Sequence, residues 1–199
     1  MQKTCVLIPN YNHSKGFDLL LTQLEIYGLD CVVIDDGSDI DHQEKIKKAC
    51  DKYSWVTYVL RKVNGGKGAA VITGLQWINE QGYSHGLQVD ADGQHDLSSI
   101  PKLIQKSTEY PDDLISGKPV YDESVPLARS IGRYATHIWV WIETLSFNIK
   151  DSMCGFRVYP IAKVCEIFDR RNLGLRMDFD IEVMVRLYWA GANCHFVDV

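Results

Sequence analysis

The sequence predicts an α/β fold in which helices flank a mainly parallel central sheet. Three observations predict it. Short apolar runs alternate with amphipathic stretches through the first 117 residues, and this is the pattern that strand–helix–strand crossover units produce. Glycine, proline or acidic residues follow most of these runs, as expected where strands end in loops. The length of 199 residues suits one domain with a full hydrophobic core.

Five short apolar runs in the first half are predicted to be buried strands. The first is stopped by Pro9 and Asn10. The predicted strands are Thr4–Ile8, Cys31–Ile34, Val56–Leu60, Gly86–Val89 and Leu114–Gly117.

Four amphipathic stretches between these runs are predicted to be helices. Ser14 is expected to cap the first helix, which ends near Gly28, and Gly82 ends the third. Their apolar faces are Phe17, Leu20, Leu21 and Leu24; Ile46, Ala49, Cys50 and Tyr53; Val71, Leu75 and Ile78; and Ile100, Leu103, Ile104 and Ser107.

The second half is less regular. An isolated strand is expected from Met153 to Tyr159, with helices near 161–171 and 179–190 and an extended segment from His195 to Val199. Before them, a long helix is predicted from one apolar stripe, which consists of Leu127, Ile131, Tyr134, Ile138, Trp141 and Leu145.

Composition narrows the class of protein. The net charge of −5 argues against a nucleic-acid binder that relies on phosphate contacts. The six cysteines have no zinc-finger spacing, which favours buried reduced thiols in a cytoplasmic protein. No apolar run approaches the roughly 20 residues that span a bilayer. A soluble protein is expected, and contact with the cytoplasmic face of a membrane stays open.

Polar clusters follow the predicted strands, at the edge where parallel sheets bind ligands. They lie at residues 9–12, 35–38, 65–68 and 90–96. In the last cluster, a strand would turn Asp90 and Asp92 to one face, where the two charges repel unless water or a cation lies between them. Hard oxygen ligands suit Mg²⁺ or Mn²⁺, so metal-assisted phosphate chemistry is the first hypothesis. His95 and Asp96 either cap a helix or orient this metal site.

The glycine-rich loop matches no common phosphate-binding motif. Arg61 stands where a P-loop needs its first glycine, and Gly68 follows Lys67 where serine or threonine is needed. The dinucleotide fingerprint fails as well. Lys67 beside a helix N-terminus can attract a phosphate, although a tight turn with a solvated lysine is the simpler interpretation of this loop alone.

Five motifs occur along the chain in a fixed order, and they are more specific together than apart. They are Pro9-Asn10-Tyr11-Asn12, Asp35-Asp36-Gly37-Ser38, Asn64-Gly65-Gly66-Lys67-Gly68-Ala69, Asp90-Ala91-Asp92-Gly93-Gln94-His95 and Ser152-Met153-Cys154-Gly155-Phe156-Arg157. With these motifs the chain resembles family 2 glycosyltransferases of the GT-A fold, in the branch of dolichyl- and polyprenyl-phosphate mannosyltransferases. The resemblance covers nearly the whole chain.

The resemblance implies one GT-A domain over residues 1–199, with a donor-nucleotide half at 1–117 and an acceptor half at 118–199. It also implies three groups of binding residues. Those implied for the donor nucleotide sugar are Pro9, Tyr11, Asn12, Asp36, Lys67, Asp90 and Ala91; for the metal, Asp92 and Gln94 with Asp90; and for the acceptor phosphate, Lys118, Arg129 and Arg133. From spacing alone, the two arginines fit a solvated helix edge as well as paired binding of an anion.

The activity implied is inverting transfer of a sugar from a UDP- or GDP-linked donor by direct displacement. Mg²⁺ or Mn²⁺ would offset charge on the departing diphosphate, which makes Asp92 a catalytic residue. A lipid-linked phosphate acceptor is already ionised, whereas a hydroxyl of an envelope glycan or lipid would need a general base, for which Asp151 is the candidate.

Departures from the family pattern leave alternatives open. His13 stands where many relatives carry glutamate, and Lys118 replaces a frequent arginine. Relatives continue past the segment that matches 196–198 with further basic residues, so a shortened chain and a compact variant are both considered. The alternatives to a glycosyltransferase are a sugar nucleotidyltransferase and a non-catalytic nucleotide-sugar-binding module.

Overall fold

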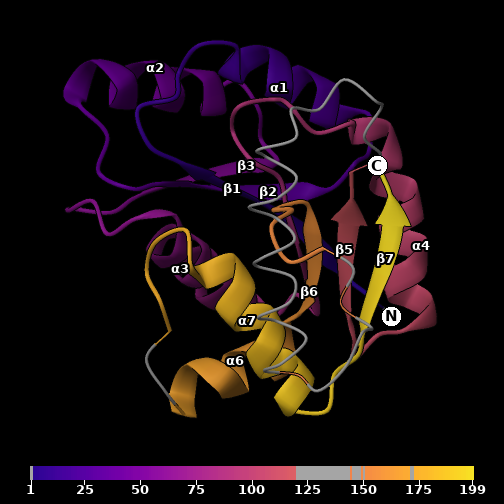
Figure 1. Ribbon diagram of the computed structural model, residues 1–199. Coiled ribbons are helices and arrows are strands. Elements are labelled where there is room, and N and C mark those ends of the chain that lie inside the picture. The colour runs from indigo at the N-terminus through magenta and orange to yellow at the C-terminus, as the bar shows by residue number, and fades with distance from the viewer. Residues whose placement is uncertain (1, 120–143, 145–148, 150, 171–172) are drawn as a thin grey trace, which may run out of the picture.

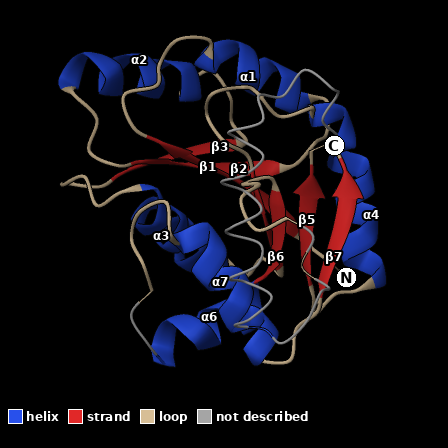
Figure 2. Ribbon diagram, in the orientation of Figure 1, coloured by secondary structure: helices blue, strands red, loops and turns tan. Residues whose placement is uncertain are grey.

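A seven-stranded sheet lies at the centre of the molecule (Figures 1 and 2). The computed structural model describes residues 2–119, 144, 149, 151–170 and 173–199. Across the sheet the strands run in the order β3-β2-β1-β4-β6-β5-β7. In chain order they are β1 (Thr4–Asn10), β2 (Asp30–Asp35), β3 (Val56–Leu60), β4 (His85–Gln88), β5 (Leu114–Lys118), β6 (Arg157–Pro160) and β7 (Cys194–Asp198).

The sheet is mainly parallel, as predicted. Strand β1 pairs in parallel with β2 and β4, β2 with β3, and β5 with β7. Among the described strands only β6 runs the other way, antiparallel to both β4 and β5. Because β6 is reversed, its first residue lies at the edge where the parallel strands end. The loop that precedes β6 therefore reaches the edge expected to bind ligands.

Helices cover both faces of this sheet. Figure 2 shows α1 (Phe17–Glu25), α2 (Ile40–Cys50) and α4 (Ile100–Glu109) on one face, with α3 (Lys67–Glu80), α6 (Ile161–Arg170) and α7 (Phe179–Trp189) on the other. A short 3₁₀ helix, η1 (Leu97–Ser99), precedes α4. Among the described helices, none combines the length and the apolar character that crossing a bilayer requires.

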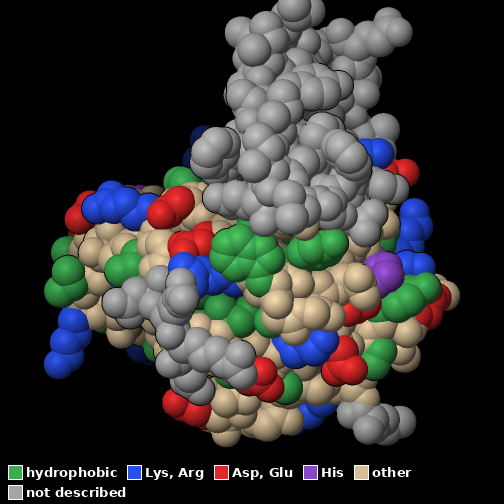
Figure 3. Space-filling view, turned by 60° about the horizontal axis from the view of Figure 1, so that its bottom comes forward, with side chains coloured by type: hydrophobic (Ala, Val, Ile, Leu, Met, Phe, Trp, Pro, Cys, Tyr) green, Lys and Arg blue, Asp and Glu red, His purple; other side chains and the backbone are tan. Residues whose placement is uncertain are grey.

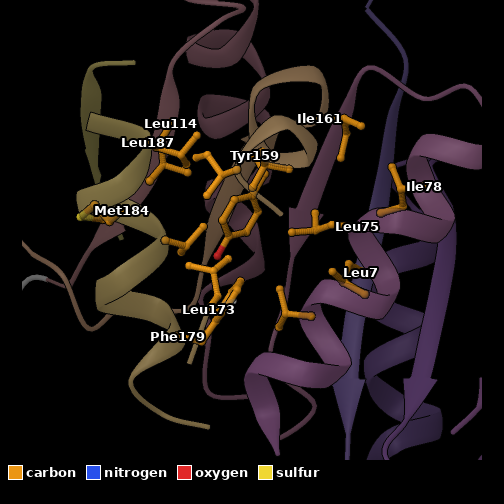
Figure 4. Packing of buried hydrophobic residues seen from close by; sticks show 14 of the residues in the cluster. Leu7, Leu75, Ile78, Leu114, Tyr159, Ile161, Leu173, Phe179, Met184 and Leu187 are labelled. Atoms are coloured by element: carbon orange, nitrogen blue, oxygen red, sulfur yellow. The ribbon is translucent and has the colours of Figure 1, made fainter. Parts of the chain in front are cut away.

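Alternate side chains of β1 enter two separate hydrophobic cores. Val6 and Ile8 pack with α1, α2 and α4, whereas Cys5 and Leu7 pack with α3, α6 and α7. This alternation is the two-residue repeat of a strand that is covered on both sides. Figure 4 shows the second core, in which Tyr159 of β6 lies among side chains of α3 and α7.

Several local expectations were wrong. Strand β1 continues through Pro9 and Asn10, which were expected to stop it. Gly16, with φ +75°, is the N-cap of α1, because the Ser14 hydroxyl pairs instead with His42 Nδ1 at 2.9 Å. Strand β4 ends at Gln88, one residue early, and β6 begins at Arg157 rather than at Met153. The predicted helix over 127–145 lies almost wholly outside the described residues.

All six cysteines are free thiols, and four of them are buried. On the face drawn in Figure 3, lysine and arginine side chains of the described residues are interspersed with aspartate and glutamate side chains.

Candidate functional site

A cavity of about 530 Å³ lies at the carboxyl edge of the parallel strands. Its walls come from the ends of β1, β2 and β4, from the start of α3 and from the segment before α7. The structure thus brings Asp36 and Asp92 into one cleft, as the placement of the polar clusters predicted. The lining residues are Pro9, Asn10, Tyr11, His13, Asp36, Asn64, Gly66, Lys67, Ala70, Asp90, Ala91, Asp92, Arg176 and Met177.

The loop after β1 is tied to the loop after β2. Asn12 adopts φ +54°, a left-handed conformation that asparagine tolerates better than most residues. Its backbone N–H donates to Ser38 Oγ at 2.8 Å, and its amide oxygen accepts from the Asp39 backbone at 2.7 Å. Asn12 therefore supports the cavity wall, while the neighbouring Tyr11 lines the cavity and is half exposed.

The carboxylate of Asp36 holds the glycine-rich loop. It is 2% exposed and accepts the backbone N–H of Gly66 at 2.7 Å and that of Gly65 at 3.1 Å. The Arg61 guanidinium forms an ion pair with its other oxygen. Asp36 lines the cavity, and the same carboxylate also orders the loop that leads into α3.

Lys67, the first residue of α3, is not a solvated lysine. Its ammonium lies 2.9 Å from Asp90 Oδ2 and 3.3 Å from Asp180 Oδ2. Burial lowers the pKa of Lys67, but the charges of Asp180 and Asp90 outweigh it, so the pKa lies above its ordinary value. The simpler interpretation of this loop was therefore wrong, because two carboxylates from distant segments converge on the lysine.

Asp90 is held from three sides. Burial raises the pKa of Asp90, but His95 and the Lys67 ammonium lower it by a larger amount. The pKa of Asp90 therefore lies well below its ordinary value. Gln88 Nε2 donates to Asp90 Oδ1 at 3.1 Å. His95 Nε2 lies 3.5 Å from Asp90 Oδ2, too long for a good hydrogen bond, and we attribute most of the stabilisation to Lys67. Asp90 remains ionised at neutral pH.

A buried arginine joins this cluster to β6 and α7. Arg157 is fully buried and donates to the carbonyl oxygens of Cys154 at 2.7 Å, Ser152 at 2.9 Å and Asp180 at 2.5 Å. Between these contacts, a Cβ atom on Gly155 would lie 2.7 Å from Asp90 Oδ2 and 2.8 Å from Lys67 Nζ. A side chain at position 155 would therefore displace the Lys67–Asp90 pair, on which the loop before β6 packs.

Asp92 and Gln94 are the more exposed members of the predicted metal set. Since β4 ends at Gln88, the argument that a strand turns Asp90 and Asp92 to one face does not apply, although both residues line the cavity. Asp92 Oδ1 accepts the Gln94 backbone N–H at 3.0 Å, and no side chain of the described residues forms an ion pair with Asp92. Gln94 is exposed and is not among the lining residues. In the described part of the chain, no group of three or more His, Cys, Asp or Glu side chains converges on a point that could hold a metal.

Three other predicted residues within the described part of the chain, Asp151, Lys118 and Asp96, do not line the cavity. Asp151 is buried, and its Oδ1 accepts the backbone N–H groups of Met153 and Cys154 at 2.8 and 3.0 Å. Lys118 ends β5, with its ammonium 3.6 Å from Asp198 Oδ1. Arg129 and Arg133 lie outside the described residues. Asp96 caps η1 through the Ser98 N–H at 3.0 Å, one of the two alternatives considered.

Sequence reasoning missed Arg176 and Met177. Both line the cavity, although they precede α7 and belong to none of the five motifs. Their segment packs on the glycine-rich loop, where the Ala69 backbone N–H donates to the Leu175 carbonyl at 3.0 Å. The glycines at 66 and 68 were the available signal, because they mark a close approach of another segment, but they do not say which segment approaches.

Comparisons with known proteins agree with this arrangement. The model of the family described as "Glycosyl transferase family 2" matches residues 5–168. The dolichyl-phosphate beta-glucosyltransferase of Saccharomyces cerevisiae is 30% identical over 90% of this chain and 61% of its own length. The undecaprenyl-phosphate mannosyltransferase of Micrococcus luteus is 26% identical over 79% of this chain and 66% of its own length. The chain thus spans less than two thirds of the length of these two curated relatives.

Among solved structures, glucosyl-3-phosphoglycerate synthase from Mycobacterium tuberculosis superposes with a TM-score of 0.71 at 13% identity, covering 100% of this chain and 71% of that one. That structure is a complex with Mn²⁺, uridine-diphosphate-glucose and phosphoglyceric acid. At this identity the likeness establishes a shared fold.

Proposed function

Since this chain belongs to glycosyl transferase family 2, we propose that it transfers a sugar from a nucleotide diphosphate donor to a lipid-linked phosphate. One observation carries the proposal: Asp36, Lys67, Asp90 and Asp92, which come from three separate motifs, line a single cavity at the carboxyl edge of the sheet. The relatives named for dolichyl and undecaprenyl phosphate support the choice of acceptor class.

The cavity suits the base and ribose of a donor at its β1–β2 side. Pro9 offers an apolar surface, and Tyr11 an aromatic ring that is half exposed. The Asp36 carboxylate accepts from three donors, Arg61, Gly65 and Gly66, with the Gly65 N–H shared by both oxygens, so a fourth donor completes its roughly four acceptor positions. A ring N–H of uracil or guanine is a fitting donor for it. The base is therefore proposed to lie against Asp36.

A divalent cation fits this site through Asp92. Its carboxylate lines the cavity and is exposed, and hard oxygen ligands are those that Mg²⁺ and Mn²⁺ take. The Asp90 carboxylate is neutralised by Lys67, so we assign it to positioning. Oxygens of the donor diphosphate would complete the coordination. The bound cation would offset negative charge on the leaving nucleotide.

The proposed reaction is a direct displacement at the anomeric carbon with inversion. An acceptor phosphate is ionised at neutral pH, so an oxygen of it attacks without a general base. Asp151 then keeps the role that its contacts give it, which is to order the turn at Met153 and Cys154. The protein's part is to hold donor and acceptor in line and to stabilise charge on the diphosphate.

The first test is a thermal-shift panel of UDP- and GDP-sugars, each with and without Mn²⁺. A true donor raises the apparent melting temperature according to its concentration over its dissociation constant. Titration calorimetry with that donor then compares the wild type with Asp92→Ala. We expect Asp92→Ala to lose the part of the affinity that depends on Mn²⁺. Asp112→Ala, at an exposed position before β5, serves as the control. Unchanged Mn²⁺-dependent affinity in Asp92→Ala would count against the proposed metal site.

Product analysis separates the reaction from its alternatives. Glycosyl transfer from the donor to a polyprenyl phosphate releases UDP or GDP, whereas nucleotidyl transfer from UTP or GTP to a sugar 1-phosphate releases pyrophosphate. Donor binding without turnover, with every acceptor lipid tried, would favour a nucleotide-sugar-binding module. Pyrophosphate release would replace the proposed function with nucleotidyl transfer.

A further inference from the structure

Arg176 is a cation without a counter-charge in the cavity. Its side chain lines the cavity and is exposed, and no ion pair within 4.0 Å joins it to a carboxylate of the described residues. Lys67, the other basic residue on the cavity wall, is shared between Asp90 and Asp180, and Arg61, which lies outside the wall, pairs with Asp36. The guanidinium of Arg176 is therefore available to an anionic ligand.

The segment that carries Arg176 is seated on the glycine-rich loop. A Cβ on Gly66 would lie 2.6 Å from the Leu175 carbonyl oxygen and 2.9 Å from Arg176 Cγ. A Cβ on Gly68 would lie 2.8 Å from the Gly174 carbonyl oxygen and 2.6 Å from Phe179 Cβ. These approaches are too short for any residue with a side chain, so both glycines are required for the segment to lie where it does.

A hydrogen bond fixes the same segment. The Ala69 N–H, in the first turn of α3, donates to the Leu175 carbonyl at 3.0 Å. On the other side of the segment, the Gly174 N–H donates to Glu182 of α7 at 2.5 Å. Arg176 thus directly follows two residues that are held in place, Leu175 by α3 and Gly174 by α7. Because the segment is fixed by these contacts, the Arg176 side chain is held on the cavity wall.

Charge matching in the cavity points to the ligand class. Of the charged residues on its walls, Asp92 and Arg176 alone lack a partner of opposite charge among the described residues. One free carboxylate and one free guanidinium complement a ligand that carries a cation and phosphate groups together. A guanidinium binds phosphate oxygens in pairs through its planar fork.

We propose that Arg176 binds the diphosphate of the donor, and that Gly66 and Gly68 serve to seat the Arg176 segment rather than to cradle phosphate themselves. This inference rests on the proposed function, since it requires a nucleotide diphosphate in the cavity. It assigns Arg176 to the site from outside the five motifs. It also gives a reason for a glycine-rich loop that fits neither common phosphate-binding pattern.

The test is calorimetry on the full chain with Mn²⁺, using the nucleoside, its monophosphate and its diphosphate for whichever base the wild type binds. Arg176→Met should weaken diphosphate binding about 10- to 100-fold, because a charge-assisted hydrogen bond is lost, and leave nucleoside binding unchanged. Arg176→Lys keeps the positive charge but loses the planar fork of the guanidinium. Its diphosphate affinity should therefore lie between that of the wild type and that of Arg176→Met. Lys48→Met, which removes one charge from an exposed position on α2, is the matched control.

A second variant tests whether the glycine-rich loop positions the Arg176 segment. Gly68→Ala should displace this segment and weaken diphosphate binding. Most of this effect should vanish when Arg176 is already replaced by methionine. Equal diphosphate affinity in Arg176→Met and the wild type overturns the inference, and so does an equal loss for nucleoside and diphosphate. If the wild type binds neither UDP nor GDP, the proposed function itself fails, and this result is distinct from the others.

Discussion

At the scale of single residues, the site depends on how its buried charges are balanced. Lys67 stands between Asp90 and Asp180, with 21% of its side chain exposed. Charges withdrawn from water in this way are stable only when a partner is close. The arrangement links the loop after β4, the start of α3 and the start of α7 through one ammonium group.

Removing this ammonium should destabilise the fold. Lys67→Met leaves the buried Asp180 carboxylate and the partly buried Asp90 carboxylate without their shared cation, and breaking a buried pair costs about 3 kcal/mol in the free energy of unfolding. Urea unfolding at pH 7 measures it. Lys52→Met removes an exposed partner of Asp18, with the two side chains 50% and 55% exposed, and should cost at most about 1 kcal/mol. Equal losses in the two variants would mean that the Lys67 cluster is not a buried ion pair.

At the scale of elements, the third helix approaches the sheet more closely than a helix with ordinary side chains can. Gly74 of α3 faces Leu7 of β1, which is fully buried. A Cβ at position 74 would overlap Leu7 Cδ1 and lie 3.1 Å from Ile34 Cγ1. This close contact sets the height of the helix above the sheet, and thus the position of Lys67 at its N-terminus.

Gly74→Ala should therefore reverse the usual effect of alanine in a helix. In a helix interior the change usually stabilises by about 1 kcal/mol. Here overpacking should dominate, with a net loss of about 1 to 3 kcal/mol in the free energy of unfolding. Chemical denaturation of a double-mutant cycle checks the cause, because Leu7→Ala makes room and should reduce the penalty of Gly74→Ala. A penalty that persists in the Leu7→Ala background would show that Leu7 is not the obstacle.

At the scale of the whole molecule, the two ends of the parallel strands have different roles. The carboxyl edge carries the cavity, whereas the opposite edge carries structural contacts such as that of His85, whose Nε2 donates to the Pro111 carbonyl at 3.0 Å. Burial lowers the pKa of His85, and the hydrogen bond to Pro111 and the charge of Asp112 only partly offset it. His85 is therefore held neutral in the folded protein.

This histidine should make global stability depend on pH. Its folded pKa lies below the unfolded value of about 6.5, so its contribution is fully present above that pH. The contribution is lost as the pH falls through the folded pKa, because the unfolded chain then binds the additional proton. Urea unfolding at pH 7.5 and 5.5 should show a larger loss of stability in the wild type than in His85→Gln. An identical loss in His85→Gln and the wild type would remove His85 from this account.

Local patterns were sufficient for the strands and helices of the first half. Residues close together in the chain carry these patterns. They show the two-residue repeat in strands covered on both faces and the apolar stripes of α1, α3 and α4. Their ends were less well predicted. Ser14 did not cap α1, because its hydroxyl finds a partner on α2 that no local pattern reveals.

The site divides in the same way. Residues 9–12, 35–38 and 90–92 follow strands that run in parallel, so their meeting at one edge could be predicted without coordinates. The convergence of Asp180 on Lys67 and of Arg176 on the cavity could not. Neither follows from spacing, since both depend on how α7 packs against α3.

By itself the sequence determined the fold class, the family and the polar clusters that surround the cavity, because periodicity and motif order are properties of neighbouring residues. Tertiary structure alone decided the reversed direction of β6, the pairing of Lys67 and the presence of Arg176 on the wall. The physical reason is that these features arise from contacts between segments far apart in the chain. Such contacts are selected by the packing of whole helices and strands rather than by the preferences of individual residues.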